Sequence, residues 1–142
     1  MKIAFWDSSA LVPLHVPRQD GAATLQRLLD EYPPVIWWDS QVEVSSALER
    51  LRRRGELSPE EYAAARQRQE SMGAWLEIPP TEDLRELAKV CLARHELRAA
   101  GALQLAAALT WCRERPSGRP FLCRDRRLIA AARAEGFLVV EP

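Results

Sequence analysis

Short apolar runs alternate along the chain with longer segments of mixed polarity. Runs at 3–6 and 35–38 each end in an Asp-Ser pair, others lie at 121–123 and 137–140, and a weaker one lies at 75–78. Short, continuously apolar runs of this kind are typical of strands buried on both faces. Because helical segments separate them, the pattern predicts a three-layer α/β domain with a central parallel sheet flanked by helices.

Local signals indicate where several helices begin and end. Ser58-Pro59-Glu60-Glu61 offers an N-cap, a proline at the first helical position and a glutamate at N3. In the preceding helix an i, i+3, i+4, i+7 stripe is formed by Val44, Ala47, Leu48 and Leu51. Gly55 follows where a glycine would end that helix, so the two helices should form a hairpin. The segment 99–111 has Ala and Leu on every side and is expected to be buried against the sheet.

Composition narrows the class of protein. A length of 142 residues with 47% hydrophobic and 28% charged residues fits one globular domain over 1–142. The 20 basic and 20 acidic side chains give a net charge of zero, so a nucleic-acid partner would need a local basic patch. All the basic residues except Lys2 and Lys89 are arginine, the side chain suited to bidentate phosphate and carboxylate contacts.

The spacing of the cysteines and the length of the apolar stretches indicate in which cellular compartment to expect the protein. The sequence has 3 cysteines with no Cys-x-x-Cys spacing, so it indicates neither a disulfide framework nor a zinc site. No apolar stretch of signal-peptide length follows Met1, and no segment approaches the about 18 apolar residues of a membrane span. We therefore expect a cytoplasmic protein without a membrane partner.

Three acidic residues stand at comparable places beside the predicted strands. Asp7 directly follows the first run, Glu43 lies one turn into the helix after the second, and Asp125 comes just after the fourth. The carboxyl ends of parallel strands share one edge, where ligands bind at the point at which strand order reverses. Carboxylates about 5 Å apart repel by roughly 3 kcal/mol at an effective dielectric near 20, so such a cluster takes up protons or a cation. Mg²⁺ or Mn²⁺ would suit these oxygen ligands and support hydrolysis of a phosphodiester.

Each acid also has a purely structural interpretation. Asp7 and Asp125 precede helical segments, as N-cap residues do. Ser40-x-x-Glu43 matches a capping box, in which Glu43 would turn back to a backbone amide. Only the joint position of the three acids favours a functional site over three separate caps.

Four segments spread along the whole chain form a recognisable set. They are Asp7-Ser8-Ser9-Ala10-Leu11, Val42-Glu43-Val44, Leu97-Arg98-Ala99-Ala100-Gly101-Ala102-Leu103-Gln104-Leu105-Ala106 and Asp125-Arg126-Arg127-Leu128. Together they resemble the PIN-domain ribonucleases, and within them the VapC-type toxins of bacterial toxin–antitoxin pairs. The resemblance implies a PIN-like fold, an RNA-cleaving site with Mg²⁺ or Mn²⁺ held by four acids, a homodimer, and inhibition by an antitoxin. Asp7, Glu43 and Asp125 match three of the four acidic positions, as catalytic and metal-binding residues.

The fourth acidic position is occupied by Gly101, where the family's motif has an aspartate. Loss of even an outer hydrogen-bond partner of a metal site commonly lowers affinity or rate 10- to 100-fold, and loss of a ligand should be no milder. Glycine is also about 1 kcal/mol worse than alanine within a helix. Two hypotheses follow: an endoribonuclease toxin impaired at Gly101, or a catalytically inactive binding module that keeps the homodimer and the antitoxin surface. Gln104, one turn further on, could contribute a carbonyl oxygen or hold a water, but we expect it to be a helix-surface amide.

Basic and hydroxyl side chains near the acids are candidate substrate-binding residues. Arg124 and Arg126 flank Asp125 and are placed to meet an RNA phosphate, while Ser8 could orient a water beside Asp7 or serve only as a cap. Arg50 and 52–54 could contact RNA, but cations in the last turn of a helix also complement its dipole. The glycines form neither a P-loop nor a dinucleotide-binding fingerprint. His15 and His95 have no partner at ligand spacing and are interpreted as structural or exposed.

Overall fold

The structure is a computed structural model that describes residues 2–16, 21–72 and 75–142. Along the chain the elements are β1 (Ala4–Trp6), α1 (Ser8–His15), α2 (Ala22–Glu31), β2 (Pro34–Trp37), α3 (Ser40–Arg53), α4 (Pro59–Ser71), β3 (Leu76–Ile78), α5 (Glu82–Arg94), α6 (Ala99–Trp111), β4 (Pro120–Leu122), α7 (Arg126–Glu135) and β5 (Leu138–Val140). The five predicted strands are confirmed, with shifts of one residue at their ends. Trp38 lies just beyond β2 and is 52% exposed, although the apolar run predicted it as a strand residue.

The strands form one parallel sheet in the order β3-β2-β1-β4-β5. Phe5 of β1 pairs with Val35 of β2 on one side and with Phe121 of β4 on the other. The chain first builds the sheet outward from β1 through β2 to β3, and then returns to the opposite side of β1 with β4. Strand order therefore reverses at β1, and the crevice outside the carboxyl ends of β1 and β4 is where ligands bind in such sheets.

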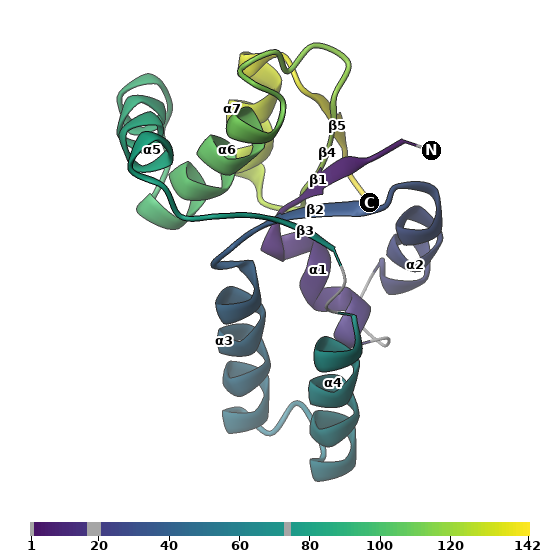
Figure 1. The fold of residues 1–142 in the computed structure, drawn as a ribbon. Coiled ribbons are helices and arrows are strands. Elements are labelled where there is room, and N and C mark those ends of the chain that lie inside the picture. Colours follow the sequence, from purple (N-terminus) through teal and green to yellow (C-terminus); the bar gives the residue numbers. More distant parts are fainter. Residues whose placement is uncertain (1, 17–20, 73–74) are drawn as a thin grey trace.

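Helices cover both faces of the sheet, so the predicted three-layer α/β architecture is confirmed (Figure 1). Side chains alternate between the faces, as strand geometry requires. Phe5 and Phe121 pack with α5, α6 and α7, whereas Trp6 and Leu122 pack with α1, α2, α3 and α4. On the first face α5 lies outside α6, and α6 is the buried helix that its all-round apolar sequence predicts (Figure 1).

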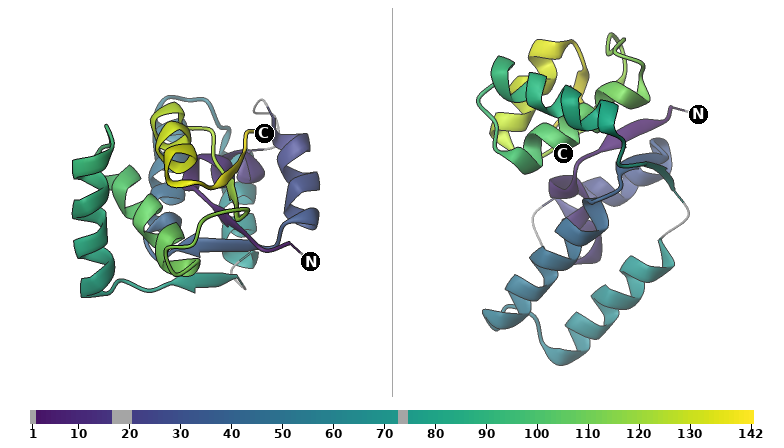
Figure 2. Two further views of the ribbon diagram at one scale, coloured as in Figure 1. Left: turned by 90° about the horizontal axis from the view of Figure 1, so that it is seen from above. Right: turned by 60° about the vertical axis from the view of Figure 1, so that its left-hand side comes forward.

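The helices α3 and α4 form the predicted hairpin, which extends away from the sheet (Figure 2). The capping box of α4 is present: Ser58 Oγ accepts from the Glu61 amide at 3.1 Å, and Glu61 Oε1 accepts from the Ser58 amide at 2.9 Å. Gly55 follows α3 with a φ of 71°, a left-handed conformation that favours glycine. Polar contacts join the two helices, among them the bond that Gln69 Nε2 donates to Ser45 Oγ at 2.9 Å.

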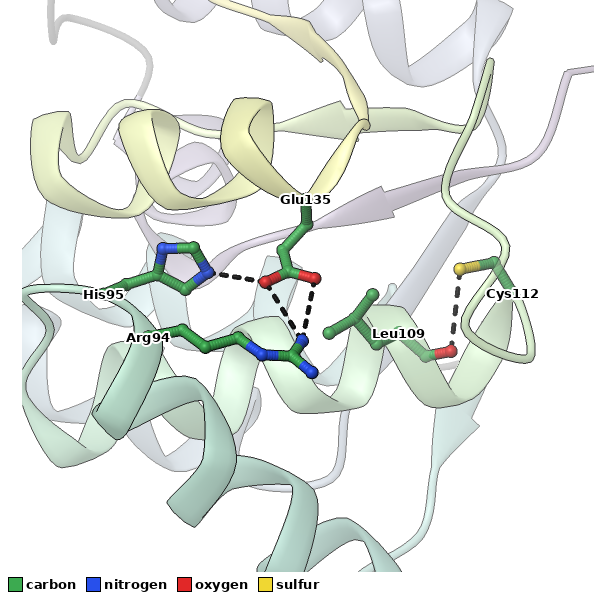
Figure 3. Close-up of polar contacts among 5 residues, drawn as sticks. All are labelled: Arg94, His95, Leu109, Cys112 and Glu135. Atoms are coloured by element: carbon green, nitrogen blue, oxygen red, sulfur yellow. Dashed lines mark hydrogen bonds and ion pairs between the residues drawn. The ribbon is translucent and has the colours of Figure 1, made fainter.

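Side-chain contacts also fasten the helices of the other layer. Glu135, at the end of α7, accepts hydrogen bonds from Arg94 and lies 2.6 Å from His95 Nε2, which ties α7 to the end of α5 (Figure 3). His95 therefore has a structural role, as one of its two interpretations predicts. The three cysteines are buried free thiols, and Cys112 donates a weak bond to the Leu109 carbonyl (Figure 3). None of the helices described here is long and apolar enough to cross a membrane.

Candidate active site

A cleft of about 750 Å³ opens at the carboxyl edge of the sheet, where strand order reverses. Its walls come from the end of β1 and from α1, α3, α6 and the start of α7. The lining residues that the sequence singles out are Asp7, Ser8, Glu43, Gly101, Gln104 and Asp125. The three acids thus border one cleft, although 118 residues separate the first from the last.

Asp7 follows β1 and is the N-cap of α1, with 4% of its surface exposed. Its Oδ2 accepts hydrogen bonds from the Ser9 amide at 3.1 Å and the Ser9 hydroxyl at 2.5 Å, and the Cys123 thiol lies 3.6 Å away. Burial raises the pKa of the Asp7 carboxyl; the Ser9 bonds oppose the shift, and the charge of Asp125 adds to it. The capping interpretation is therefore confirmed, and it holds together with a place in the cleft.

Glu43 lies in the first turn of α3, and its carboxylate meets α6. Its Oε2 accepts from Gln104 Nε2 at 2.8 Å, whereas its Oε1 is buried without a hydrogen-bond partner among the described residues. Burial is the main cause that raises the pKa of Glu43, and the charges of Asp7 and Asp39 raise it further. Gln104 and the nearby Ser8 hydroxyl oppose this rise, although Ser8 does not reach hydrogen-bonding geometry with Oε1.

The predicted capping box at Ser40 is wrong. Asp39 is the N-cap of α3 and makes no side-chain cap bond, while Ser40 is already the first helical residue. Counted from Asp39, Glu43 is at N4, one position beyond the N3 partner of a capping box, and its carboxylate instead accepts a hydrogen bond from the amide of Gln104.

Gln104 is not the surface amide that we expected, because only 1% of it is exposed. It is the one polar side chain on the buried face of α6, and its Nε2 donates to Glu43 and, at 3.1 Å, to Ser40 Oγ. Its Oε1 is buried and has no hydrogen-bond partner in the described part of the chain. The sequence does carry a signal for this residue: a lone amide within an otherwise Ala- and Leu-rich buried helix needs a polar partner.

Asp125 is the N-cap of α7, so its structural interpretation is also confirmed. Its Oδ1 accepts from the Leu128 amide at 3.0 Å. The residue is exposed at the rim of the cleft, in contrast to Asp7. It is near enough for its charge to raise the pKa of Asp7, which makes the two carboxylates electrostatic neighbours.

The cleft offers oxygen atoms but no preformed cage for a metal ion. Over residues 2–16, 21–72 and 75–142, no group of three or more Asp, Glu, His or Cys side chains is arranged to hold an ion. Mg²⁺ is commonly bound through one or two carboxylates and keeps several of its waters. Burial disfavours the charged forms of the Asp7 and Glu43 carboxylates, and the Oε1 atoms of Glu43 and Gln104 have no partner among the described residues. These oxygen atoms fit an ion that is held in that way.

Gly101 lies in the first turn of α6 and lines the cleft. Its φ is outside the left-handed region, and a Cβ added there would meet only Leu97 Cδ2 at 3.5 Å, which is ordinary van der Waals contact. Neither the backbone nor the packing therefore requires glycine at this position. A side chain can therefore begin at this position, on the wall of the cleft that Asp7, Glu43 and Asp125 also line.

The basic residues divide between the cleft and its surroundings. Arg126 lines a second hollow next to the cleft. The guanidinium of Arg124 lies against Gly21 instead, and its backbone amide donates to Ser9 Oγ at 2.9 Å. Arg50 and Arg98 line the acidic cleft; sequence reasoning missed Arg98 because it precedes a helix without an acid beside it.

Comparison of the sequence with protein-family models finds no match, and comparison with curated proteins finds none either. Solved structures, however, are similar in fold. A chain of a toxin–antitoxin complex from Klebsiella pneumoniae has a TM-score of 0.63 at 16% identity, covering 89% of this chain and 90% of that one. A chain of FitAcB from Neisseria gonorrhoeae has a TM-score of 0.64 at 14% identity, covering 96% of both chains. At these identities the shared property is the fold, over nearly the whole length.

Proposed function

We propose that this protein is the toxin of a type II toxin–antitoxin pair and a Mg²⁺- or Mn²⁺-dependent endoribonuclease that acts in the cytoplasm. The observation that carries the proposal is the convergence of Asp7, Glu43 and Asp125 on one cleft at the edge where strand order reverses. The resemblance of the sequence to VapC-type PIN-domain toxins supports it. So does the similarity of fold to a chain from a toxin–antitoxin complex.

In this proposal the chain's own residues hold and orient the reactants. Asp7 and Glu43 hold the ion, with Asp125 at the rim completing the acidic set. When bound, the ion supplies positive charge that neutralises the phosphodiester and makes water more acidic. Gln104 fixes the rotamer of Glu43 through its 2.8 Å bond, and Ser8 is placed to orient water in the cleft. Hydrolysis then adds one water across a P–O bond of RNA.

Because glycine occupies position 101, we expect the ribonuclease activity of this chain to be weak. A fourth carboxylate is missing at this position, where an added Cβ would make only ordinary van der Waals contact. Gly101→Asp should therefore raise the rate of RNA cleavage in Mn²⁺ by about tenfold or more, the lower end of what a partner of a metal site contributes. The measurement is cleavage of a labelled single-stranded RNA by the wild-type chain and by Gly101→Asp, each with and without Asp7→Asn.

The outcomes separate the hypotheses. Cleavage by the wild-type chain that disappears in Asp7→Asn supports an active nuclease. Cleavage only by Gly101→Asp supports a site impaired at one position. If neither chain cleaves RNA, the enzyme proposal is wrong, and the alternative remains: a binding module of this fold that keeps the homodimer and the antitoxin surface. The absence of a preformed group of three ligands among the described residues is the observation that favours this alternative.

The proposal also includes two protein partners, an antitoxin and a second copy of this chain. The hairpin of α3 and α4 extends from the body of the domain and is amphipathic along α3, which suits contact with an antitoxin or a second copy of the chain (Figure 1). Light scattering of the purified chain tests the homodimer directly. A chain that stays monomeric at high concentration would remove the homodimer from the proposal without affecting the nuclease assay.

A further inference from the structure

A second hollow, which we call the arginine groove, opens next to the acidic cleft. It has a volume of about 400 Å³ and lies between the start of α6 and the start of α7. The groove and the cleft share Arg98, Ala100, Gly101, Asp125 and Leu128 as lining residues. The two hollows are therefore neighbours, and a ligand can extend from one into the other.

Three exposed arginines line this groove: Arg98, Arg126 and Arg127. The guanidinium groups of Arg98 and Arg126 make no hydrogen bond or ion pair with a described residue. Arg127 has only a 3.8 Å contact with the exposed Glu96, and surface pairs of this kind contribute little. Some arginines elsewhere are engaged, such as Arg66 with Ser45 and Arg94 with Glu135, whereas others lie singly on the surface. The groove thus concentrates cations whose charge is free for a ligand.

We propose that the arginine groove holds the phosphate backbone of single-stranded RNA on one side of the bond to be cleaved. The inference rests on the proposed function and adds a path for the substrate. A volume of about 400 Å³ is that of a small-molecule pocket, which takes a nucleotide or two of a single strand but not a duplex. Arginine forks match phosphate oxygens, and continuity with the acids favours RNA over an acidic peptide.

Binding is tested without cleavage, by fluorescence anisotropy of a labelled 12-nucleotide single-stranded RNA in EDTA at increasing salt. The test variant is Arg98→Ala/Arg126→Ala/Arg127→Ala. The control variant is Arg27→Ala/Arg85→Ala/Arg115→Ala, which removes the same charge from exposed positions outside both hollows. Each phosphate contact contributes a slope of about −0.7 in log affinity against log salt for a single strand. We expect the test variant to flatten this slope by about 2 and to bind at least tenfold more weakly than the control.

The remaining outcomes are distinct from those of the cleavage assay. If the test and control variants bind RNA equally, the groove proposal is wrong even when the chain cleaves RNA. If the test variant alone loses RNA binding while neither the wild-type chain nor Gly101→Asp cleaves, the groove stands and the nuclease proposal fails. A poly-glutamate peptide is the third probe. Loss of peptide binding with RNA binding intact would assign the groove to an acidic peptide and overturn our proposal.

Discussion

Buried His15, the last residue of α1, should make the stability of this fold depend on pH. Its side chain is 2% exposed, and its Nδ1 has no hydrogen-bond partner among the described residues. Burial lowers the pKa of His15 from its ordinary 6.5 to about 4, and the nearby charge of Arg68 contributes to the decrease. Arg68 is held there by the 2.6 Å bond that its Nη2 donates to the His15 carbonyl.

The sign and size of the effect follow from these two pKa values. The unfolded chain protonates His15 below about 6.5, and the folded chain only below about 4, so the unfolded state binds more protons in between. Stability from this group is complete above the higher value and is lost as the pH falls toward the lower one. At 1.36 kcal/mol per pKa unit the full loss is about 3 kcal/mol, of which about 2 kcal/mol is lost by pH 5. For a domain of this size that is a decrease in Tm of roughly 8 °C.

The raised pKa values of Asp7 and Glu43 act in the opposite direction, so a single curve of stability against pH is not diagnostic. The diagnostic measurement is therefore urea unfolding of the wild-type chain and of His15→Phe, each at pH 7.5, 6 and 5. Over this range the wild-type chain should lose about 2 kcal/mol more than the variant. Arg68→Met should narrow the pH window, because the pKa of His15 then rises. Parallel curves for the wild-type chain and His15→Phe would refute the reasoning.

Three further substitutions have definite expected outcomes. Gln104→Leu removes a hydrogen bond that stabilises the charged form of Glu43, so the pKa of Glu43 should rise and Mn²⁺ affinity, measured by calorimetry, should fall 10- to 100-fold; unchanged affinity would contradict this. Gly101→Ala should stabilise the fold by about 1 kcal/mol in urea unfolding, because alanine has the higher helix propensity and the added methyl would make only an ordinary van der Waals contact. Ser58→Ala should cost about 1 kcal/mol through loss of the α4 cap, with Mn²⁺ binding unaffected.

The sheet and most helix boundaries could be predicted because they depend on short-range signals. Apolar runs marked all five strands within one residue, and Ser58 and Gly55 marked the ends of the hairpin helices. Trp38 was assigned to a strand because polarity alone does not tell where an apolar run leaves a sheet. The strand order, which creates the cleft, is a property of the whole chain, and no local pattern contains it.

The errors at the site have a different origin. Ser40 and Glu43 have the spacing of a capping box, but the helix begins one residue earlier than that motif needs. Gln104 has the composition of a surface residue, yet its neighbours bury it against Glu43. In both cases the position of the side chain depends on the contact between α3 and α6, which joins Glu43 to Gln104, 61 residues further along the chain. The lone amide in a buried helix does indicate that Gln104 needs a polar partner, but no local feature of the sequence identifies Glu43 as that partner.

For Asp7 and Asp125, the structural and chemical interpretations do not compete. In a parallel sheet the residue that follows a strand is also the residue that begins the next helix, so a cap and a ligand-binding edge occupy the same place. Asp125 uses Oδ1 for its cap, and Asp7 uses Oδ2. Asparagine caps a helix about as well as aspartate, so Asp7→Asn keeps the cap and removes only the charge. Loss of Mn²⁺ binding at an unchanged or higher free energy of unfolding would therefore separate the two roles, whereas loss of both would mean that the charge itself maintains the fold.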